Sequence, residues 1–134
     1  NSAATNGNPF ASSDYVRHKQ ELVDTGLEIH EYIGKISYHG KSIAIDDRLA
    51  IVGSFNMDMR STYLDTELML VIESKRLNEE IRDTENVYIE KSKEVKTDGT
   101  ETEGSLYKKK VLTPEKKRFY AFLKIIIRPF RHLL

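Results

Sequence analysis

The sequence contains no cysteine and no long apolar run. Disulfide bonds and thiol chemistry are therefore excluded, and cysteine usage gives no information about the redox compartment. No stretch approaches the roughly 18 consecutive apolar residues that predict a membrane-spanning helix. The chain also lacks an initiator methionine and a signal-like start, and it opens on the loop-like run NSAATNGNPF. This opening favours a piece of a longer protein.

Charge is unevenly distributed over the 134 residues, a length typical of about one domain. Lys plus Arg and Asp plus Glu each number 21, so the formal net charge is zero. From Leu106 to the end, however, nine basic residues accompany one acidic residue, Glu115, which gives +8 there and −8 in the rest of the chain. A basic tail on an acidic body predicts an anionic partner for the tail, either lipid headgroups or nucleic acid.

Capping residues and apolar spacing predict three helices. Residues 1–12 are expected to be a loop, and Ser13 or Asp14 to cap a helix that runs to about Thr25, with Gly26 as its stop. A second helix is expected after the cap residue Ser74. A third helix is expected to start near Thr113, with Pro114 at its first position.

Short apolar stretches predict four strands. LEIHEYI alternates as a half-buried strand does, and SIAID and LAIVG predict two strands joined by a tight turn. ELMLVIE is continuously apolar and predicts a central strand buried on both faces. KTDGTETEGS is expected to be a polar linker. The order of elements predicts a mixed α/β fold.

The segment YHGKSIAIDDRLAIVGSFN carries most of the chemistry. His39 and Lys41 lie two apart, so they project from one face if the chain is extended there. Histidine suits nucleophilic or acid–base work near neutral pH, and the lysine attracts an anion such as phosphate. Gly53 allows close backbone approach, while Ser54 and Asn56 offer neutral donors. The segment therefore predicts a metal-independent site for a phosphoryl group.

The spacing is His-x-Lys, four residues, Asp46, six residues, then Gly-Ser-x-Asn. This pattern resembles the HKD signature of the phospholipase D superfamily at every fixed position. The following GSFNMDMRSTYLDTELMLVI is similar to the bacterial cardiolipin synthase branch, and SSDYVRHKQELVDTGLEIHEY is similar to the helix and strand that precede the second HKD motif of such enzymes. The resemblance covers about residues 1–82.

The resemblance implies a role for each matched residue. His39 is the catalytic imidazole, one of a pair in which one histidine forms a phosphohistidine and the other acts as general acid and base. Lys41 and Asn56 bind phosphate oxygens with help from Ser54. Glu67 matches a carboxylate that orients the imidazole. The remaining signature residues, Asp46 and Gly53, support the site.

Only one HKD motif is present, whereas the family's active site is built from two. We expect the chain to be the C-terminal half of a two-motif enzyme, and the alternative is a chain that pairs with a second copy as the small nuclease members do. The acidic body argues against nucleic acid as a partner. A third possibility is a non-catalytic domain that binds phosphate or lipid.

The expected organisation is a phospholipase D-like half-domain over residues 1–94, with a central mixed β-sheet flanked by helices. A polar and basic linker over 95–112 and a basic amphipathic helix over 113–134 follow. The last helix predicts either an interfacial contact with anionic lipid or docking on the domain or the missing half. The expected parent is a bacterial phosphatidyltransferase or phosphodiesterase, peripheral to the cytoplasmic membrane, that acts on phospholipid without metal or cofactor.

Overall fold

The computed structural model describes residues 1–133, with side chains described as far as Phe130, so residue 134 of the predicted tail helix lies outside the described residues. It confirms the mixed α/β class. The strands form two three-stranded antiparallel sheets rather than one central mixed sheet. The chain divides into two compact units, residues 1–38 with 89–131, and residues 39–88.

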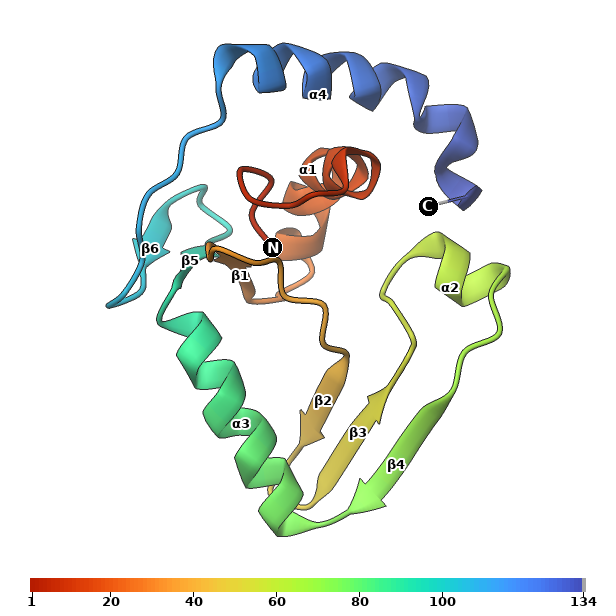
Figure 1. Cartoon of the computed structure of the whole chain (residues 1–134), viewed down its shortest axis with the longest axis vertical. Coiled ribbons are helices and arrows are strands. Elements are labelled where there is room, and N and C mark those ends of the chain that lie inside the picture. Colours follow the sequence, from red (N-terminus) through yellow and green to blue (C-terminus); the bar gives the residue numbers. More distant parts are fainter. Residues whose placement is uncertain (134) are drawn as a thin grey trace. The chain divides into compact units, whose positions relative to one another are not determined.

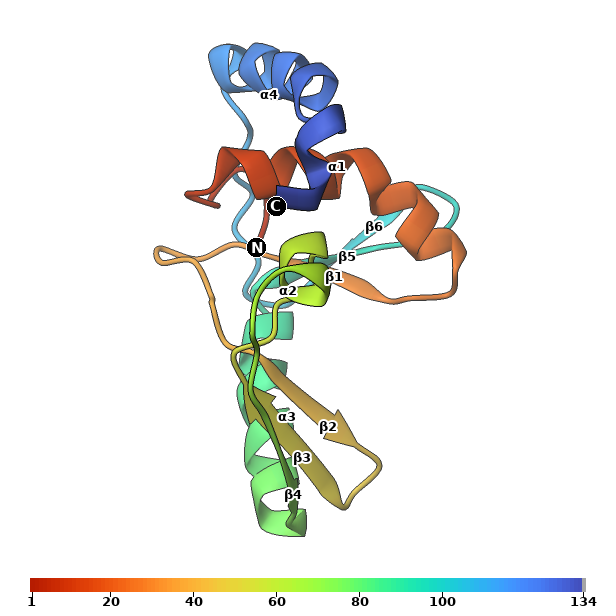
Figure 2. The same ribbon diagram turned by 90° about the vertical axis from the view of Figure 1, so that its right-hand side faces the viewer.

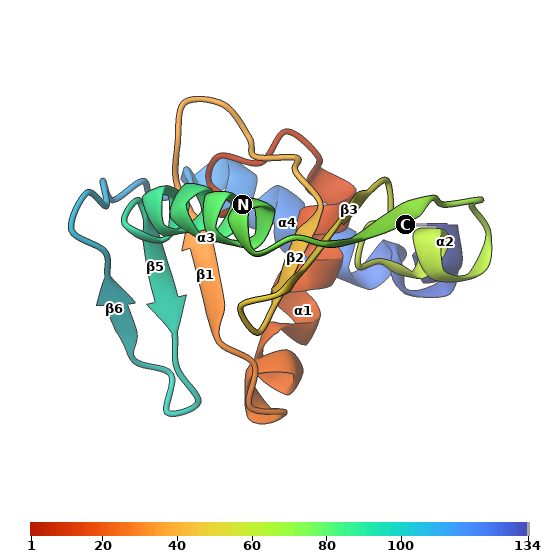
Figure 3. The same cartoon turned by 90° about the horizontal axis from the view of Figure 1, so that it is seen from below.

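The first unit contains a sheet of order β1-β5-β6 together with the terminal helices of the described chain. Figure 3 shows these three strands side by side. Ile29 pairs with Val95, and Val95 in turn pairs with Glu101. The elements of this unit are α1 (Pro9–Asp24), β1 (Ile29–Tyr32), β5 (Ser92–Val95), β6 (Glu101–Glu103) and α4 (Pro114–Ile126), and η1 (Arg128–Leu133) follows α4.

Helix α1 begins earlier than the sequence analysis predicted. The side chain of Asn8 accepts hydrogen bonds from the backbone N–H groups of Phe10 and Ala11, and Pro9 occupies the first turn. An Asn cap followed by proline is a strong start signal. Ser13 is instead a buried helical residue whose hydroxyl donates to the carbonyl of Pro9. The prediction of Ser13 or Asp14 as the cap was therefore wrong.

The segment expected to be a polar linker, residues 96–105, contains strand β6. Asp98 accepts hydrogen bonds from the backbone and hydroxyl of Thr100, and Gly99 adopts φ 78° in the turn between β5 and β6. An Asp-Gly turn is a hairpin signal. The strand was missed because all three of its residues are exposed, so it has no apolar alternation.

Helix α4 begins after Thr113, whose hydroxyl accepts from the N–H of Lys116, as predicted. It lies against α1 (Figures 1 and 2), and the side chains of Tyr120, Leu123 and Ile127 are buried. The hydroxyl of Tyr120 also donates to the carbonyl of Ala3 at 3.2 Å. Among the described residues, no helix combines the length and hydropathy needed to cross a membrane.

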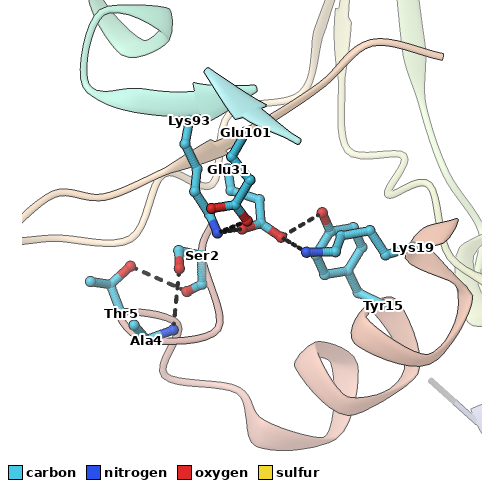
Figure 4. A network of polar contacts seen from close by, with 8 residues as sticks. All are labelled: Ser2, Ala4, Thr5, Tyr15, Lys19, Glu31, Lys93 and Glu101. Atoms are coloured by element: carbon cyan, nitrogen blue, oxygen red, sulfur yellow. Dashed lines mark hydrogen bonds and ion pairs between the residues drawn. The ribbon is translucent and has the colours of Figure 1, made fainter. Parts of the chain in front are cut away.

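A charged network fills the space between α1 and β1 (Figure 4). The buried carboxylate of Glu31 accepts from the hydroxyl of Tyr15 at 3.0 Å and from Nζ of Lys19 at 2.9 Å. Nζ of Lys93 lies 3.2 Å away and also pairs with Glu101. Burial by itself would raise the pKa of Glu31, but the hydrogen bond and charge of Lys19, with Lys93 and Tyr15, lower it below the ordinary value.

The second unit is built on a sheet of order β2-β3-β4 (Figure 1). Ile43, Ile51 and Val71 lie opposite one another across the three strands, as do Ala44, Ala50 and Ile72. The elements of this unit are β2 (Ser42–Ile45), β3 (Leu49–Gly53), α2 (Met59–Tyr63), β4 (Met69–Glu73) and α3 (Lys75–Ile89), of which α3 extends one residue beyond the unit.

Helix α3 runs along one face of this sheet (Figure 2). Ser74 caps it through the N–H of Leu77, as predicted. The fully buried amide of Asn78 donates to the carbonyls of Ile45 and Leu49 at 3.3 and 2.6 Å. These bonds fix the helix to the two strands beside the β2–β3 turn.

Strand β4 lies at an edge of the sheet, so the prediction of a central strand buried on both faces was wrong. Leu70 and Val71 are about three-fifths exposed, at 59% and 61%. The continuous apolar run of β4 gives the strand apolar side chains on both faces. Helix α3 lies along only one of these faces. On the other face, Ile43 and Ile45 are also exposed.

Candidate phosphoryl-binding site

Five of the predicted site residues lie in segments at one end of the β2–β3–β4 sheet. His39 and Lys41 precede β2, Ser54 and Asn56 follow β3, and Glu67 precedes β4. Because neighbouring strands are antiparallel, the start of β2, the end of β3 and the start of β4 lie at the same end of the sheet. The fold therefore gathers residues that are up to 28 positions apart in the sequence.

Gly53 brings strands β3 and β4 unusually close at this end. A Cβ atom on Gly53 would lie 2.1 Å from the carbonyl oxygen of Leu68 and 2.5 Å from Sδ of Met69. Gly53 pairs with Met69, and its N–H donates to the carbonyl of Lys41 at 3.2 Å. The missing side chain allows the close approach on which the next contacts depend.

Ser54 links the two strands beyond Gly53. Its hydroxyl donates to Oε2 of Glu67 and accepts from the N–H of Leu68 at 3.1 Å. Its own N–H donates to the carbonyl of Leu68 at 3.0 Å. The serine hydroxyl is thus held by two partners on the neighbouring segment, and it fixes the carboxylate of Glu67 at the end of the sheet.

The carboxylate of Glu67 is stabilised in its charged form. The hydrogen bond from Ser54 lowers its pKa most, followed by one from Ser61 and by the positive charges of Lys41 and Arg60. Glu67 is therefore an anion in a partly cationic setting. It can accept a further hydrogen bond, because a carboxylate offers about four lone-pair positions.

Asn56 is positioned through the short helix α2. Its Nδ2 lies 3.4 Å from Oγ of Ser61, a residue that is itself buried. The N–H of Ser61 donates at 2.7 Å to Asp58, which caps the helix. These contacts place the carboxamide of Asn56 next to the serine that also bonds Glu67.

His39 and Lys41 precede β2 at the same end of the sheet. The ammonium of Lys41 donates to the backbone carbonyl of His39 at 2.9 Å, so the lysine side chain folds back toward the histidine. His39 is exposed, and Lys41 is half-buried. Within the described part of the chain, the imidazole makes no hydrogen bond or ion pair with Glu67 or with any other side chain.

Asp46, the remaining signature residue, lies away from this cluster. It occupies the turn between β2 and β3 at the opposite end of the sheet, with φ 51°. Its backbone carbonyl accepts from Nη2 of Arg82 on α3. An aspartate tolerates this left-handed conformation better than most residues do. The position fits support of the hairpin rather than contact with a ligand.

Sequence reasoning did not single out Ser61, which contacts both Asn56 and Glu67. The signal was available, since this serine closes the run Gly-Ser-x-Asn-x-Asp-x-Arg-Ser. Asp58 caps α2, and Arg60 pairs with Asp65 at 3.0 Å.

The cluster presents one cation, one anion, neutral donors and an accessible imidazole around the same end of the sheet. This set suits a tetrahedral oxyanion that accepts hydrogen bonds, with a nitrogen nucleophile beside it. Among the side chains that the structure describes, residues 1–130, no group of three or more His, Asp and Glu residues is placed to hold a metal ion.

Comparison with known proteins found relatives that include several cardiolipin synthases A. The chain is 36% identical over 73 residues to cardiolipin synthase A of Buchnera aphidicola subsp. Schizaphis graminum, a match that covers 54% of this chain and 15% of that protein. Cardiolipin synthase A of Yersinia pseudotuberculosis serotype O:1b is 35% identical over 72 residues, and that of Wigglesworthia glossinidia brevipalpis 34% over 73. The chain therefore spans about one seventh of these relatives. No solved structure gave a significant match.

A family model described as the cardiolipin synthase, PLD-like domain matches residues 3–87. This range contains the site cluster and closely follows the extent of the resemblance expected from the sequence, residues 1–82. It ends within α3, before β5, β6 and α4. Because the match covers more than half of the chain, the protein belongs to the family of cardiolipin synthase PLD-like domains.

Proposed function

We propose that this chain supplies one half-site of a phospholipase D-type phosphatidyltransferase or phosphodiesterase that acts on phospholipid phosphodiester bonds. The observation that carries the proposal is the convergence of Lys41, Ser54, Asn56 and Glu67 at the sheet end that also bears the accessible His39. Membership of the cardiolipin synthase PLD-like family supports the same chemistry.

The proposed reaction has two steps. An imidazole nitrogen attacks phosphorus, and the bond between phosphorus and the leaving alcohol breaks as a second histidine gives that alcohol a proton. Water, or the hydroxyl of a second lipid, then displaces the imidazole from phosphorus. Lys41 and Asn56 stabilise charge on the non-bridging oxygens in both steps.

Glu67 is proposed to orient the imidazole of His39 by accepting a hydrogen bond from its far nitrogen. Ser54 occupies Oε2, and the other lone pairs of the carboxylate remain for this contact. Active-site hydrogen bonds are often completed only when substrate is bound. The lowered pKa of Glu67 keeps it charged at the pH where an imidazole titrates, which suits an orienting acceptor.

A second half is proposed to complete the site, because the sequence holds a single HKD motif. The open face of the β2–β3–β4 sheet, which exposes Ile43, Ile45 and Val71, supports a further layer against this unit. The N-terminal half of the same protein is the favoured partner, and a second copy of the chain is the alternative. The division into residues 1–94, 95–112 and 113–134 stays a prediction.

The proposed substrate is a phospholipid, so the proposed location is the surface of a bacterial cytoplasmic membrane. Nucleic acid is not the proposed substrate, because residues 1–105 carry a net charge of −8.

The proposal is tested by measuring phosphodiester cleavage and transfer with the 134-residue chain alone and mixed with a second HKD half, together with the mass of each species in solution. We expect no turnover by the monomer and turnover when the second half is supplied. Turnover by a dimer of this chain alone would support the homodimeric alternative. Phosphate binding without turnover in the mixture would support the non-catalytic alternative.

In the active mixture, His39→Asn should lower turnover by about 10³-fold or more, because it removes the nucleophile or its acid–base partner. Its melting temperature should stay near that of the wild type, since His39 is exposed. His30→Asn, in strand β1, is the matched control and should retain turnover. Equal loss of turnover and melting temperature in His39→Asn would instead make His39 a structural residue.

A further inference from the structure

Helix α4 has two apolar sides, and only one of them is used inside the chain. Tyr120, Leu123 and Ile127 are buried, and the hydroxyl of Tyr120 donates to the carbonyl of Ala3. Arg17 of α1 also donates to the carbonyl of Lys124 at 3.2 Å, which fixes the rotation of the helix. The sequence analysis left docking and lipid contact as alternatives for this helix. Docking accounts for only part of its apolar surface.

The second apolar side faces solvent. Phe122 is 58% exposed and Ile125 76% exposed, at a spacing of three residues that places both on one side of the helix. Other large apolar residues are exposed on α4 and on η1, which follows it, namely Phe119, Ile126 and Phe130. We call Phe119, Phe122, Ile125, Ile126 and Phe130 the outer face of α4. Large exposed apolar patches mark contact sites for proteins or membranes.

Cations border the outer face. Lys117 and Lys124 lie seven residues apart, so both project from one flank of α4, and Arg128 follows the helix as the first residue of η1. Lys116 and Arg118 add charge at the start of the helix, and Lys108, Lys109 and Lys110 precede it. None of these side chains pairs with a carboxylate in the described residues, whereas Lys19 and Lys93 of the same unit are both paired.

We infer that the outer face of α4 is an interfacial membrane surface that inserts its aromatic and aliphatic side chains among anionic lipids. An apolar side bordered by unpaired cations matches the two attractions that hold an amphipathic helix at an anionic bilayer. Residues 106–134 carry nine basic residues and one acidic residue, Glu115, so the charge of this region complements a surface of anionic headgroups. The inference rests on the proposed function in one respect, namely that the proposed substrate is a phospholipid and therefore lies in a membrane.

The surface lies outside the range of the family match. That range ends at residue 87, and α4 begins at Pro114. The buried side of α4 holds the helix on α1, so the outer face is presented by a supported helix and not by a free tail. The structure thus assigns to the C-terminal region a role separate from the phosphoryl chemistry.

The test is binding of the full 134-residue chain to sedimented vesicles, either pure phosphatidylcholine or phosphatidylcholine containing phosphatidylglycerol. We expect binding to the anionic vesicles that weakens as salt is raised. Phe122→Ser with Ile125→Ser should weaken it by about tenfold or more, because two inserted side chains are lost. Ile36→Ser, at an 82% exposed position of the same unit, is the matched control and should bind as wild type.

A charge variant separates the two attractions. Lys117→Gln with Lys124→Gln should weaken binding to anionic vesicles by about tenfold and leave binding to neutral vesicles unchanged. The control removes the same charge from α3 by Lys75→Gln with Arg76→Gln, and it should have little effect. Because the chain has no tryptophan, Phe122→Trp supplies a fluorescence signal that should shift to the blue on insertion, while Ile36→Trp should not.

Three results would overturn the inference. The first is absence of binding to anionic vesicles, and the second is equal binding by the Phe122/Ile125 double variant. The third is a dimer, detected by mass in solution, that the double variant abolishes while vesicles are not bound. Vesicle binding and turnover are separate measurements, so turnover without binding would overturn this inference alone. Binding without turnover in the presence of a second HKD half would overturn the proposed function alone.

Discussion

Glu31 and Glu67 both have a pKa below the ordinary value, yet they lie in opposite surroundings. Glu31 is buried, and the ammonium groups of Lys19 and Lys93 contact it (Figure 4). Glu67 lies at an accessible end of a sheet, and a neutral hydroxyl, that of Ser54, is its main partner. The charge of Glu31 is neutralised by two lysines, whereas Glu67 is held in place by a hydrogen bond that leaves its charge unpaired within the described part of the chain.

The difference lies in the donors that remain for a ligand. Around Glu31, two lysines are matched by two carboxylates, since Lys93 also pairs with Glu101. Around Glu67, the ammonium of Lys41 is bonded to a backbone carbonyl and has no carboxylate in direct contact among the described residues. The proposed function places an incoming phosphate at this ammonium, whereas the charges around Glu31 are already paired.

A perturbed carboxylate is thus weak evidence of function by itself, because structural ion pairs also shift pKa values. The informative feature is a cation left without a counter-charge beside an accessible nucleophile. That criterion selects the end of the β2–β3–β4 sheet and rejects the Glu31 network. The comparison predicts that the two glutamates respond in opposite ways to the same substitution.

Glu31→Gln should have the largest effect on stability. It leaves Lys19 and Lys93 without their shared counter-charge in a buried setting, which costs about 3 kcal/mol of unfolding free energy. Denaturant titration at pH 7 measures the loss. Glu28→Gln is the matched control, because Glu28 lies just before β1 and is exposed, and it should change stability by less than about 0.5 kcal/mol.

The effect of Glu31→Gln should depend on pH. Since the pKa of Glu31 is lowered in the folded state, its stabilising contribution is complete above the ordinary carboxyl pKa and is lost as pH falls through the folded value. The gap between wild type and variant should therefore be constant near neutral pH and narrow below about pH 4.5. A gap that stays constant down to pH 3 would contradict the ionic role of Glu31.

Much of the fold could be predicted because local signals decide it. Thr113 with Pro114 gave the start of α4, and Ser74 gave that of α3. The start of α1 was missed because Asn8 and Pro9 lie in a stretch rich in residues typical of loops. Strand β6 was missed because it contains no apolar residue. Whether β4 is buried on both faces depends on which faces of the sheet other elements cover. A run of apolar residues predicts that both faces of a strand can be buried, but it does not tell which segment covers each face.

The members of the site could be named from their spacing, but their contacts could not. Antiparallel pairing brings Ser54 next to Glu67, and this contact depends on the absence of a side chain at Gly53. The sequence showed the glycine without showing what it lies against. The predicted contact between Glu67 and His39 stays a prediction, since in the structure the carboxylate is bonded to Ser54 and the imidazole is free of side-chain partners among the described residues.

Gly53→Ala should have an intermediate effect, confined to the second sheet. The added Cβ would meet the backbone oxygen of Leu68, which cannot move without separating β3 from β4. We expect a loss of about 2 kcal/mol in unfolding free energy, as for other overpacked sites, together with weaker binding of inorganic phosphate. Gly7→Ala is the control, because no atom lies within 4 Å of its added Cβ. Unchanged phosphate binding in Gly53→Ala would mean that the close approach of the strands does not shape the site.

Glu67→Gln should have the smallest effect on stability and so complete the contrast with Glu31→Gln. Its amide oxygen can still accept from Ser54, and no buried lysine loses its partner. Its effect should instead be kinetic. With a second HKD half present, turnover should fall by about tenfold, because an amide aligns the imidazole less well and does not stabilise its charged form. Glu73→Gln, at the other end of β4, should retain the wild-type rate. Since the lowered pKa keeps Glu67 ionised wherever an imidazole titrates, the loss should be uniform across neutral pH. Wild-type rates in Glu67→Gln would exclude the orienting role and leave Glu67, like Glu31, a residue that only holds its own sheet together.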